Sequence, residues 1–294
     1  MDGLKPNSAP ILIAEIGCNH KGDIEIAKEF IDVASDFCKI QHVKFQKRNN
    51  RELLSASQFD TPHPNPDNSY GSTYGEHREF LEFSVEQHRE LQSHCHSRGL
   101  TYSSSVWDIS SLREMISLKP DYIKIPSATN THEALLSIAC DEYPGEIHVS
   151  LGMTTRAEEE AIIALFQKKG RLKDLVLYAC TSGYPIQADE SCLLEIVRLR
   201  ETYRNDVGAI GYSGHHNGIS LDIVACTLGA EYIERHFTLD RTWKGTDHSA
   251  SLEPDGLRRL QRNLEQTFSA LSEKPQEILP IEVPQREKLK WRAE

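Results

Sequence analysis

Short apolar runs alternate with helix-type patterns along most of this chain. Eight runs have the length and the aliphatic content of buried parallel strands, and they cover residues 11–16, 40–46, 100–104, 122–125, 147–150, 175–180, 207–210 and 230–233. Apolar residues at helical spacing predict helices over 24–34, 83–98, 110–117, 131–139, 156–169, 190–201, 219–228 and 257–271. Eight strand–helix units predict a single (β/α)8 TIM barrel. The alternative, a doubly wound open sheet, carries a glycine-rich phosphate-binding turn after its first strand, and that motif is absent here.

Local signals set several boundaries within this pattern. Asp23 is placed to cap the first helix and Gly99 to end the second. The polar segment 49–76 is rich in proline and glycine, so we expect it to have no regular structure and to lie over the site as a long loop. We expect residues 1–271 to form the catalytic TIM-barrel domain and residues 272–294, with their prolines and many charges, to form a C-terminal linker or arm.

Composition narrows the class of partner. The chain has 33 Lys and Arg against 44 Asp and Glu, a formal net charge of −11, which argues against nucleic acid or an anionic membrane as a general partner. No apolar run approaches the roughly 20 residues that span a bilayer, and residues 1–7 lack the pattern of a signal peptide. The 7 Cys contain no Cys-x-x-Cys pair, which indicates reduced thiols in a cytoplasmic protein.

Polar side chains gather at the carboxyl ends of the predicted strands, where a TIM barrel places its active site. His215 and His236 follow neighbouring strands and make a natural half-site for a divalent metal, although a single histidine is more often a surface residue. Lys44 and Lys124 are flanked by apolar residues, so we expect them in the barrel mouth, since an unpaired lysine in the helix layer would be costly.

The two lysines, with the Ser and Thr hydroxyls at other strand ends, predict a cradle for phosphate or carboxylate oxygens. Carboxylates are fewer at these ends. Glu15 lies near the end of the first predicted strand, and Asp247 lies in the segment 244–249, which contains Gly245. Either acid also suits a solvated loop.

Seven motifs resemble those of the sialic acid (N-acetylneuraminate) synthase family. They are AEIGCNHKGD at 14–23, VKFQ at 43–46, TYGEH at 73–77, CTSGYP at 180–185, GYSGH at 211–215, IERHFT at 233–238 and TWKGTDHSASLEP at 242–254. The last resembles the animal-type subgroup, the N-acetylneuraminate-9-phosphate synthases. The match runs in register from about residue 11 to about residue 279, through nearly every strand end, and is far more specific than a lone glycine motif.

This resemblance implies a TIM-barrel transferase that condenses phosphoenolpyruvate with open-chain N-acetylmannosamine or its 6-phosphate, using Mn²⁺ or Mg²⁺. It implies small-molecule substrates and a homodimer. Carried over position by position, it implies His215 and His236 as metal ligands and Glu15 as the catalytic acid or base. It places Lys44, Ser105, Lys124, Ser127, Ser150, Ser182 and Ser213 on phosphoenolpyruvate, and Gln46, Tyr184 and Asp247 on the sugar.

Other functions stay open at this stage. The family continues into an antifreeze-like domain whose arginine reaches the partner's site, whereas this sequence ends in the linker before it. We expect that the domain was lost or removed or that another chain supplies it, so the resemblance leaves the acyl-group specificity and the swapped dimer open. A synthase acting on a different, non-acetylated aldose would keep the same cradle. A metal-dependent hydrolase normally gathers more His and carboxylate ligands. A non-catalytic sugar- or phosphate-binding relative is the third alternative.

Overall fold

Eight parallel strands close into a barrel in the order in which they occur along the chain. They are β1 (Ile11–Gly17), β2 (His42–Lys47), β3 (Thr101–Val106), β4 (Tyr122–Ile125), β5 (Glu146–Ser150), β6 (Leu175–Cys180), β7 (Ala209–Gly214) and β8 (Tyr232–His236). The computed structural model describes residues 8–291, so the expectation for residues 1–7 lies outside it, as do residues 292–294. Pairing of β1 with β8, with Glu15 opposite His236, closes the sheet. The predicted TIM barrel is confirmed.

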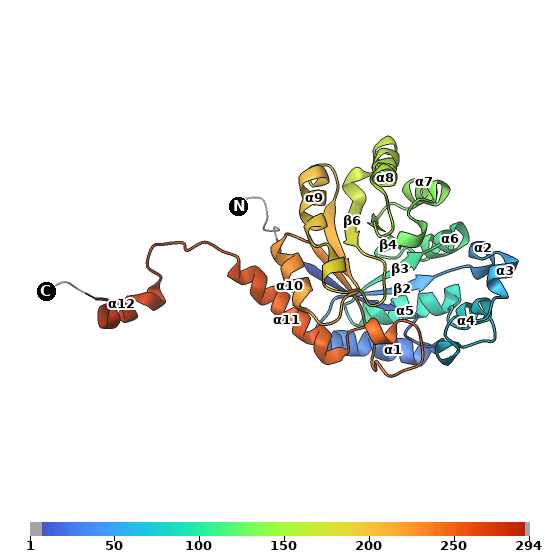
Figure 1. Cartoon of the computed structure of the whole chain (residues 1–294), viewed down its shortest axis with the longest axis horizontal. Helices are drawn as coiled ribbons and strands as arrows, with labels where there is room; N and C mark the ends of the chain where they lie inside the picture. Colours follow the sequence, from blue (N-terminus) through green and yellow to red (C-terminus); the bar gives the residue numbers. More distant parts are fainter. Residues whose placement is uncertain (1–7, 292–294) are drawn as a thin grey trace.

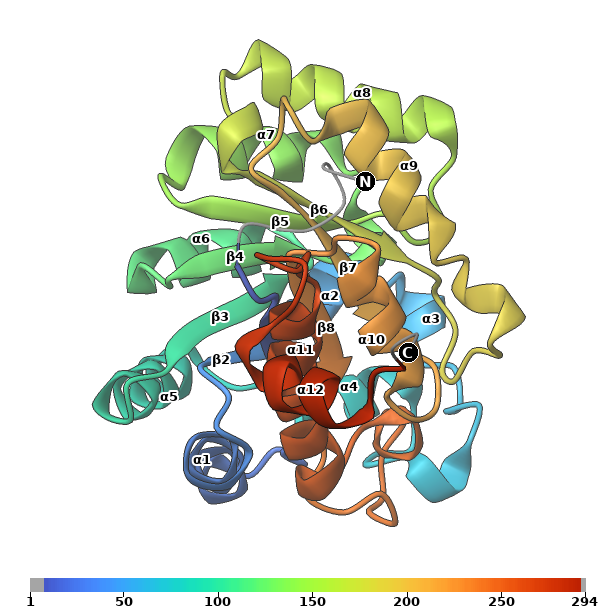
Figure 2. The same cartoon turned by 90° about the vertical axis from the view of Figure 1, so that its left-hand side faces the viewer.

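Helices lie around the outside of the strands (Figures 1 and 2). They are α1 (Ile24–Val33), α2 (Asn50–Leu53), α3 (Ala56–Phe59), α4 (Tyr74–Phe80), α5 (Val85–Ser97), α6 (Ile109–Leu118), α7 (Glu133–Glu142), α8 (Arg156–Lys168), α9 (Leu194–Tyr203), α10 (Ser220–Thr227), α11 (Pro254–Ala270) and α12 (Val283–Leu289). The Asp23 carboxylate caps α1 by accepting from the N–H groups of Glu25 and Ile26. Gly99, with φ of +71°, follows α5. Both predicted helix signals are confirmed.

The prediction of an irregular segment over 49–76 is wrong. Helices α2 and α3 and the start of α4 lie within it. The Ser55 and Gln58 side chains form a capping box at α3, and Thr73 and Glu76 form another at α4. These reciprocal hydrogen bonds satisfy the free N–H groups of short helices, so local capping overcomes the effect of the nearby prolines.

Several strands are longer at their carboxyl ends than their apolar runs predict. β7 ends at Gly214 instead of residue 210, and β8 ends at His236 instead of residue 233. The added residues face the barrel mouth on alternate positions and are polar there. The residues expected to follow the strands are therefore strand residues, which fixes their side chains more rigidly.

A floor of aromatic side chains fills the barrel below the mouth. Tyr122 and His148 stack with ring centroids 4.2 Å apart, and the His148 Nδ1 lies 2.8 Å from the Tyr178 hydroxyl. A Cβ at Gly211 would lie 2.7 Å from the Tyr178 ring, so glycine is required for that ring to fit. The interior is therefore packed beneath the site, which faces the carboxyl ends of the strands.

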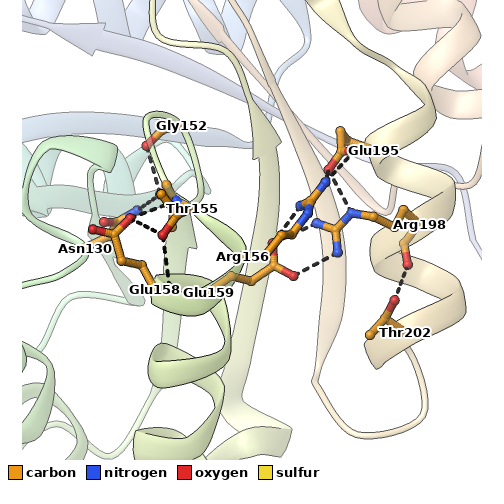
Figure 3. Close-up of polar contacts among 10 residues, drawn as sticks. Asn130, Gly152, Thr155, Arg156, Glu158, Glu159, Glu195, Arg198 and Thr202 are labelled. Carbon is orange, nitrogen blue, oxygen red and sulfur yellow. Dashed lines mark hydrogen bonds and ion pairs between the residues drawn. The ribbon is translucent and has the colours of Figure 1, made fainter.

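Outside the barrel, a network of ion pairs joins α8 to α9 (Figure 3). Glu159 is buried on α8 and accepts two N–H groups of Arg198 on α9, at 2.8 and 2.7 Å. Arg156 pairs with Glu159 at 3.1 Å and also with Glu195 on α9. The network fixes the two helices that follow β5 and β6, and it lies outside the barrel interior.

The C-terminal helix α12 stands apart from the barrel at the end of an extended segment (Figure 1). Apolar side chains on either side of this helix are exposed to solvent: Ile281 is 80% exposed and Trp291 is 82% exposed. The role of residues 272–294 as a linker or arm stays a prediction. Within residues 8–291, each helix falls short of the length and apolar character needed to cross a membrane.

Candidate active site

A cavity of about 460 Å³ opens at the carboxyl ends of the strands. The sequence-predicted site residues all line it, although they come from segments spread over 233 positions of the chain. They are Glu15, Lys44, Gln46, Ser105, Lys124, Ser127, Ser150, Ser182, Tyr184, Ser213, His215, His236 and Asp247. The structure thus brings the whole predicted set together, while their individual roles stay predictions.

Two lysines and two glutamates alternate at the centre of the cavity. The Lys44 Nζ contacts the Glu15 carboxylate and donates to the Ser105 hydroxyl at 2.7 Å. The Lys124 Nζ lies 3.0 Å from a Glu234 carboxylate oxygen, and the same oxygen is 3.8 Å from Lys44. Their side chains are at most 9% exposed. Both lysines therefore point into the mouth as predicted, and each has an acidic partner.

The two glutamates differ in their electrostatic setting. Burial raises the pKa of the Glu15 carboxyl to about 7, although Lys44 opposes the shift. Burial also tends to raise the pKa of Glu234, but Lys124 and then Lys44 outweigh it and hold that pKa at about 2. Near neutral pH, Glu234 is thus a fixed negative charge while Glu15 exchanges a proton readily, as a general acid or base requires.

The two candidate metal ligands face each other across neighbouring strands. The ring centroids of His215 and His236 lie 5.6 Å apart. The His215 Nδ1 lies 2.8 Å from the Thr181 carbonyl, so it donates there and leaves Nε2 as an acceptor. Among residues 8–291, the buried His236 Nδ1 finds no hydrogen-bond partner. Burial lowers the pKa of both imidazoles, that of His215 to about 4, so both are neutral at pH 7, as metal ligands must be.

The two histidines are two donors, fewer than the three or more side chains of a typical protein metal site. Across the described range 8–291, no group of three or more His, Cys, Asp and Glu side chains is arranged to hold an ion. Asp247 lies near, with a carboxylate oxygen 3.9 Å from the His236 Nδ1. Two neutral imidazoles fit a catalytic metal whose remaining positions are open to water and substrate.

Serine hydroxyls form a second group beside the lysines. The Gly152 N–H donates to the Ser127 hydroxyl at 3.0 Å. A Cβ at Gly152 would lie 2.4 Å from the Ser182 hydroxyl and 2.7 Å from that of Ser127, so any larger residue would fill the space between these hydroxyls. On the other side, the Ser213 hydroxyl donates to Glu234 at 3.3 Å. This arrangement suits the oxygens of a phosphate or carboxylate.

The residues expected to hold a sugar lie nearer the opening. The Tyr184 ring packs against His215 with centroids 4.3 Å apart and is half exposed. The Gln46 amide donates to the Cys18 sulfur at 2.8 Å. The Tyr184 ring therefore borders both histidines, with its centroid 5.8 Å from that of His236.

Three charged residues that line the cavity were assigned no role from the sequence. Glu234 stands two positions before His236 on β8, and side chains two apart share a face of a strand, so this spacing was an available signal. Arg48 directly follows β2, and Arg78 lies on α4; both line the cavity. No sequence pattern pointed to Arg78, because its helix was not predicted to begin inside the polar segment.

A closed parallel barrel with lysines, paired acids and two neutral histidines at its mouth defines a TIM-barrel site for small anionic molecules. Residues 30–276 match the model of the NeuB family. Over 279 residues the chain is 36% identical to the N-acetylneuraminate-9-phosphate synthase of Mus musculus, covering 95% of this chain and 76% of the relative. The chain belongs to the NeuB family, which confirms the resemblance to sialic acid synthases.

Two further comparisons extend this likeness. The chain is 31% identical over 264 residues to the N,N'-diacetyllegionaminic acid synthase of Campylobacter jejuni, covering 90% of this chain and 78% of that one. The crystal structure of an N-acetylneuraminic acid synthetase from Leptospira borgpetersenii in complex with citrate superposes with a TM-score of 0.79 at 28% identity, covering 97% of this chain and 94% of that one.

Proposed function

We propose that this chain condenses phosphoenolpyruvate with N-acetylmannosamine or its 6-phosphate to a nonulosonic (sialic) acid and releases inorganic phosphate. One observation carries the proposal: two lysines, two glutamates and two neutral histidines meet at one barrel mouth in a chain of the NeuB family. The relatives named as sialic and legionaminic acid synthases support the product class.

The chain's own groups suit each stage of this reaction. Lys44, Lys124 and the serines surrounding Gly152 hold the phosphate and carboxylate of phosphoenolpyruvate. Its C3 attacks the sugar aldehyde to form the new C–C bond, and the aldehyde oxygen takes a proton from water and becomes a hydroxyl. Positive charge then develops at C2, where a water adds before the C–O bond breaks and phosphate leaves. Glu15, with its pKa of about 7, takes a proton from that water, and the lysines stabilise the departing phosphate.

His215 and His236 are the proposed ligands of Mn²⁺ or Mg²⁺, with water and substrate in the other positions. A divalent ion bound there supplies Lewis-acid polarisation of the sugar aldehyde. The buried, partnerless His236 Nδ1 and the fixed tautomer of His215 support this assignment.

Phosphate release tests the proposal directly. Purified protein is incubated with phosphoenolpyruvate and Mn²⁺ across a panel of aldoses, namely N-acetylmannosamine, its 6-phosphate, mannose 6-phosphate and shorter sugars, with EDTA as a control. We expect EDTA-sensitive release with an N-acetylated hexosamine and a product of the corresponding nonulosonate mass. Release only with a non-acetylated sugar would identify the alternative, a synthase of a different aldose. No release with any aldose would overturn the enzyme proposal in favour of a binding protein.

We further propose that the protein is cytoplasmic and acts as a homodimer. The seven cysteines are free thiols, which supports a reducing compartment. The exposed apolar side chains around α12 support a contact with a second subunit. Analytical ultracentrifugation of this chain tests the dimer, and a monomer at all concentrations would contradict it.

A further inference from the structure

A second cationic group lies in the same cavity, apart from the two lysines. Arg48 follows β2 and Arg78 belongs to α4, and both line the cavity. Their guanidinium carbons lie 5.7 and 5.4 Å from the centroid of the Trp107 ring, so the two arginines are neighbours around one indole. The Arg48 side chain is 9% exposed and Arg78 is 7% exposed. Two buried cations thus approach each other, which is unfavourable unless an anion separates them.

Only one of the two has its charge balanced by the protein. The Arg48 Nε donates to Glu82 at 2.5 Å, and its backbone N–H donates to the other oxygen of the same carboxylate at 2.9 Å. Arg78 pairs with no carboxylate among residues 8–291, and its buried Nε has no partner. It lies over the rings of Tyr74 and Trp107 instead. Burial, and then the charge of Arg48, lower the pKa of Arg78.

A neutral donor stands one residue before Arg78. His77 is buried and lines the cavity. Its Nδ1 accepts the backbone N–H of Tyr70 at 3.1 Å, so the proton of the neutral ring is on Nε2. Burial lowers the pKa of His77 to about 4, which keeps the ring neutral at pH 7. The segment that carries these residues also reaches the loop after β8, where the Tyr70 hydroxyl donates to the Lys244 carbonyl at 2.5 Å.

We propose that Arg78, together with Arg48 and His77, binds the phosphate group of a phosphorylated aldose, so that the second substrate of the chain is a sugar phosphate. This inference rests on the proposed function. The aldehyde end of that sugar belongs at His215 and His236, whereas the arginines come from β2 and α4. The anionic group they bind is therefore on the part of the sugar remote from the aldehyde. A planar guanidinium donates two parallel N–H groups to phosphate oxygens, and Arg78 has them unused.

The distinction from the phosphoenolpyruvate cradle is electrostatic. Each central lysine already has a glutamate partner, whereas the group of Arg48, Arg78 and Glu82 retains one uncompensated positive charge. A phosphate ester neutralises that charge in a largely dehydrated site, where the interaction is stronger than in water. Arg78 therefore selects between phosphorylated and free sugars without contributing to the binding of phosphoenolpyruvate.

Steady-state kinetics of Arg78→Gln tests the inference. With saturating phosphoenolpyruvate and Mn²⁺, kcat/KM is measured for N-acetylmannosamine and for its 6-phosphate. Loss of a charged hydrogen-bond donor costs at least about a factor of ten, so we expect the ratio of the 6-phosphate value to the free-sugar value to fall at least about tenfold. Arg78→Lys keeps the charge and should restore part of the ratio. An unchanged ratio in Arg78→Gln would overturn the inference.

A matched control comes from the same segment. Arg51 lies outside the cavity, pairs with Glu79 at 3.0 Å and has a side chain that is 67% exposed. Arg51→Gln should leave the ratio of the two sugars as in the parent protein. A drop in that control equal to the drop in Arg78→Gln would show a general charge effect and overturn the specific site. Thermal unfolding of each variant verifies that it is folded.

Calorimetric titration without phosphoenolpyruvate separates this inference from the proposed function. We expect the parent protein to bind N-acetylmannosamine 6-phosphate at least about tenfold more tightly than the free sugar, and Arg78→Gln to lose that difference. Equal affinities in the parent protein would overturn the inference even if the enzyme is active. An Arg78-dependent difference in a protein that releases no phosphate with any aldose would support the inference while the synthase proposal fails.

Discussion

Replacing Glu234 by glutamine should destabilise the protein strongly. This carboxylate is the shared counter-charge of Lys124, at 3.0 Å, and Lys44, at 3.8 Å. Lys44 keeps Glu15 in the variant, but Lys124 retains only the Tyr178 ring, whose centroid is 3.7 Å from Nζ. Both lysine side chains are 2% exposed, so hydration makes up for only a small part of the lost charge. Breaking one side of a buried ion pair costs about 3–5 kcal/mol.

A loss of this size is readily measured. One kcal/mol shifts the melting temperature of a domain of this size class by about 2–4 °C, so we expect Glu234→Gln to melt roughly 6–20 °C below the parent protein in circular dichroism. Inorganic phosphate should raise the melting temperature of the variant more than that of the parent, because it supplies the negative charge that the lysines have lost.

A double variant separates charge from packing. Lys124→Met combined with Glu234→Gln removes both charges, so it should recover most of the lost stability even though it adds a second substitution. Melting of Glu234→Gln within about 2 °C of the parent would refute the reasoning, since that shift corresponds to at most about 1 kcal/mol. It would mean that water or a shift of Lys124 relieves the unpaired charge.

Four further outcomes are expected. Lys44→Ala should raise the KM for phosphoenolpyruvate at least about tenfold through loss of a charged donor, and unchanged kinetics would remove Lys44 from the cradle. His236→Ala should abolish Mn²⁺ binding in calorimetry together with turnover, and a fully active variant would rule out the proposed metal site. Burial lowers the pKa of His88 to about 3, below its unfolded value of about 6.5, so protons bind the unfolded state first. The free energy of unfolding should therefore fall below about pH 6.5 by up to about 1.4 kcal/mol per pH unit. Measured by urea unfolding, the slope of this free energy against pH should be smaller in His88→Gln by up to that amount. An equal slope in the variant and the parent protein would contradict the assignment. Glu159→Gln should lower unfolding stability by about 1–3 kcal/mol with unchanged kinetics, and an altered KM would contradict the separation of the α8–α9 network from the site.

The repeating part of the fold was predictable because it depends on local pattern. Outward-facing strand residues such as Ile123 and Ile125 pack under the helices and are aliphatic, so each strand leaves an apolar run. The strands were predicted to end too early because their last residues are polar. Ser213 and Glu234 face the mouth, and a polar residue there looks like the start of a loop.

The candidate site was predicted as far as its members stand at strand ends or in family motifs. The residues that escaped are held by contacts that join distant segments. Arg48 is fixed by Glu82, 34 positions away, and Arg78 by the ring of Trp107, 29 positions away in the chain. Burial of a cation cannot be inferred from sequence when its neighbours come from other elements. The sequence of a helix that lines a site therefore resembles that of a solvent-exposed helix.

The charge balance of the centre indicates how binding and proton transfer are coupled. With both acids ionised, Glu15 and Glu234 neutralise Lys44 and Lys124. An anion that enters beside the lysines adds negative charge next to both carboxylates. Glu234, held at a pKa of about 2, stays ionised, whereas Glu15, with a pKa of about 7, is the group that responds. The added charge raises the Glu15 pKa further, which in the proposed reaction favours transfer of a proton from the attacking water to Glu15. In that reaction Glu15 releases the proton again as phosphate departs, so the buried pair supplies one exchangeable proton.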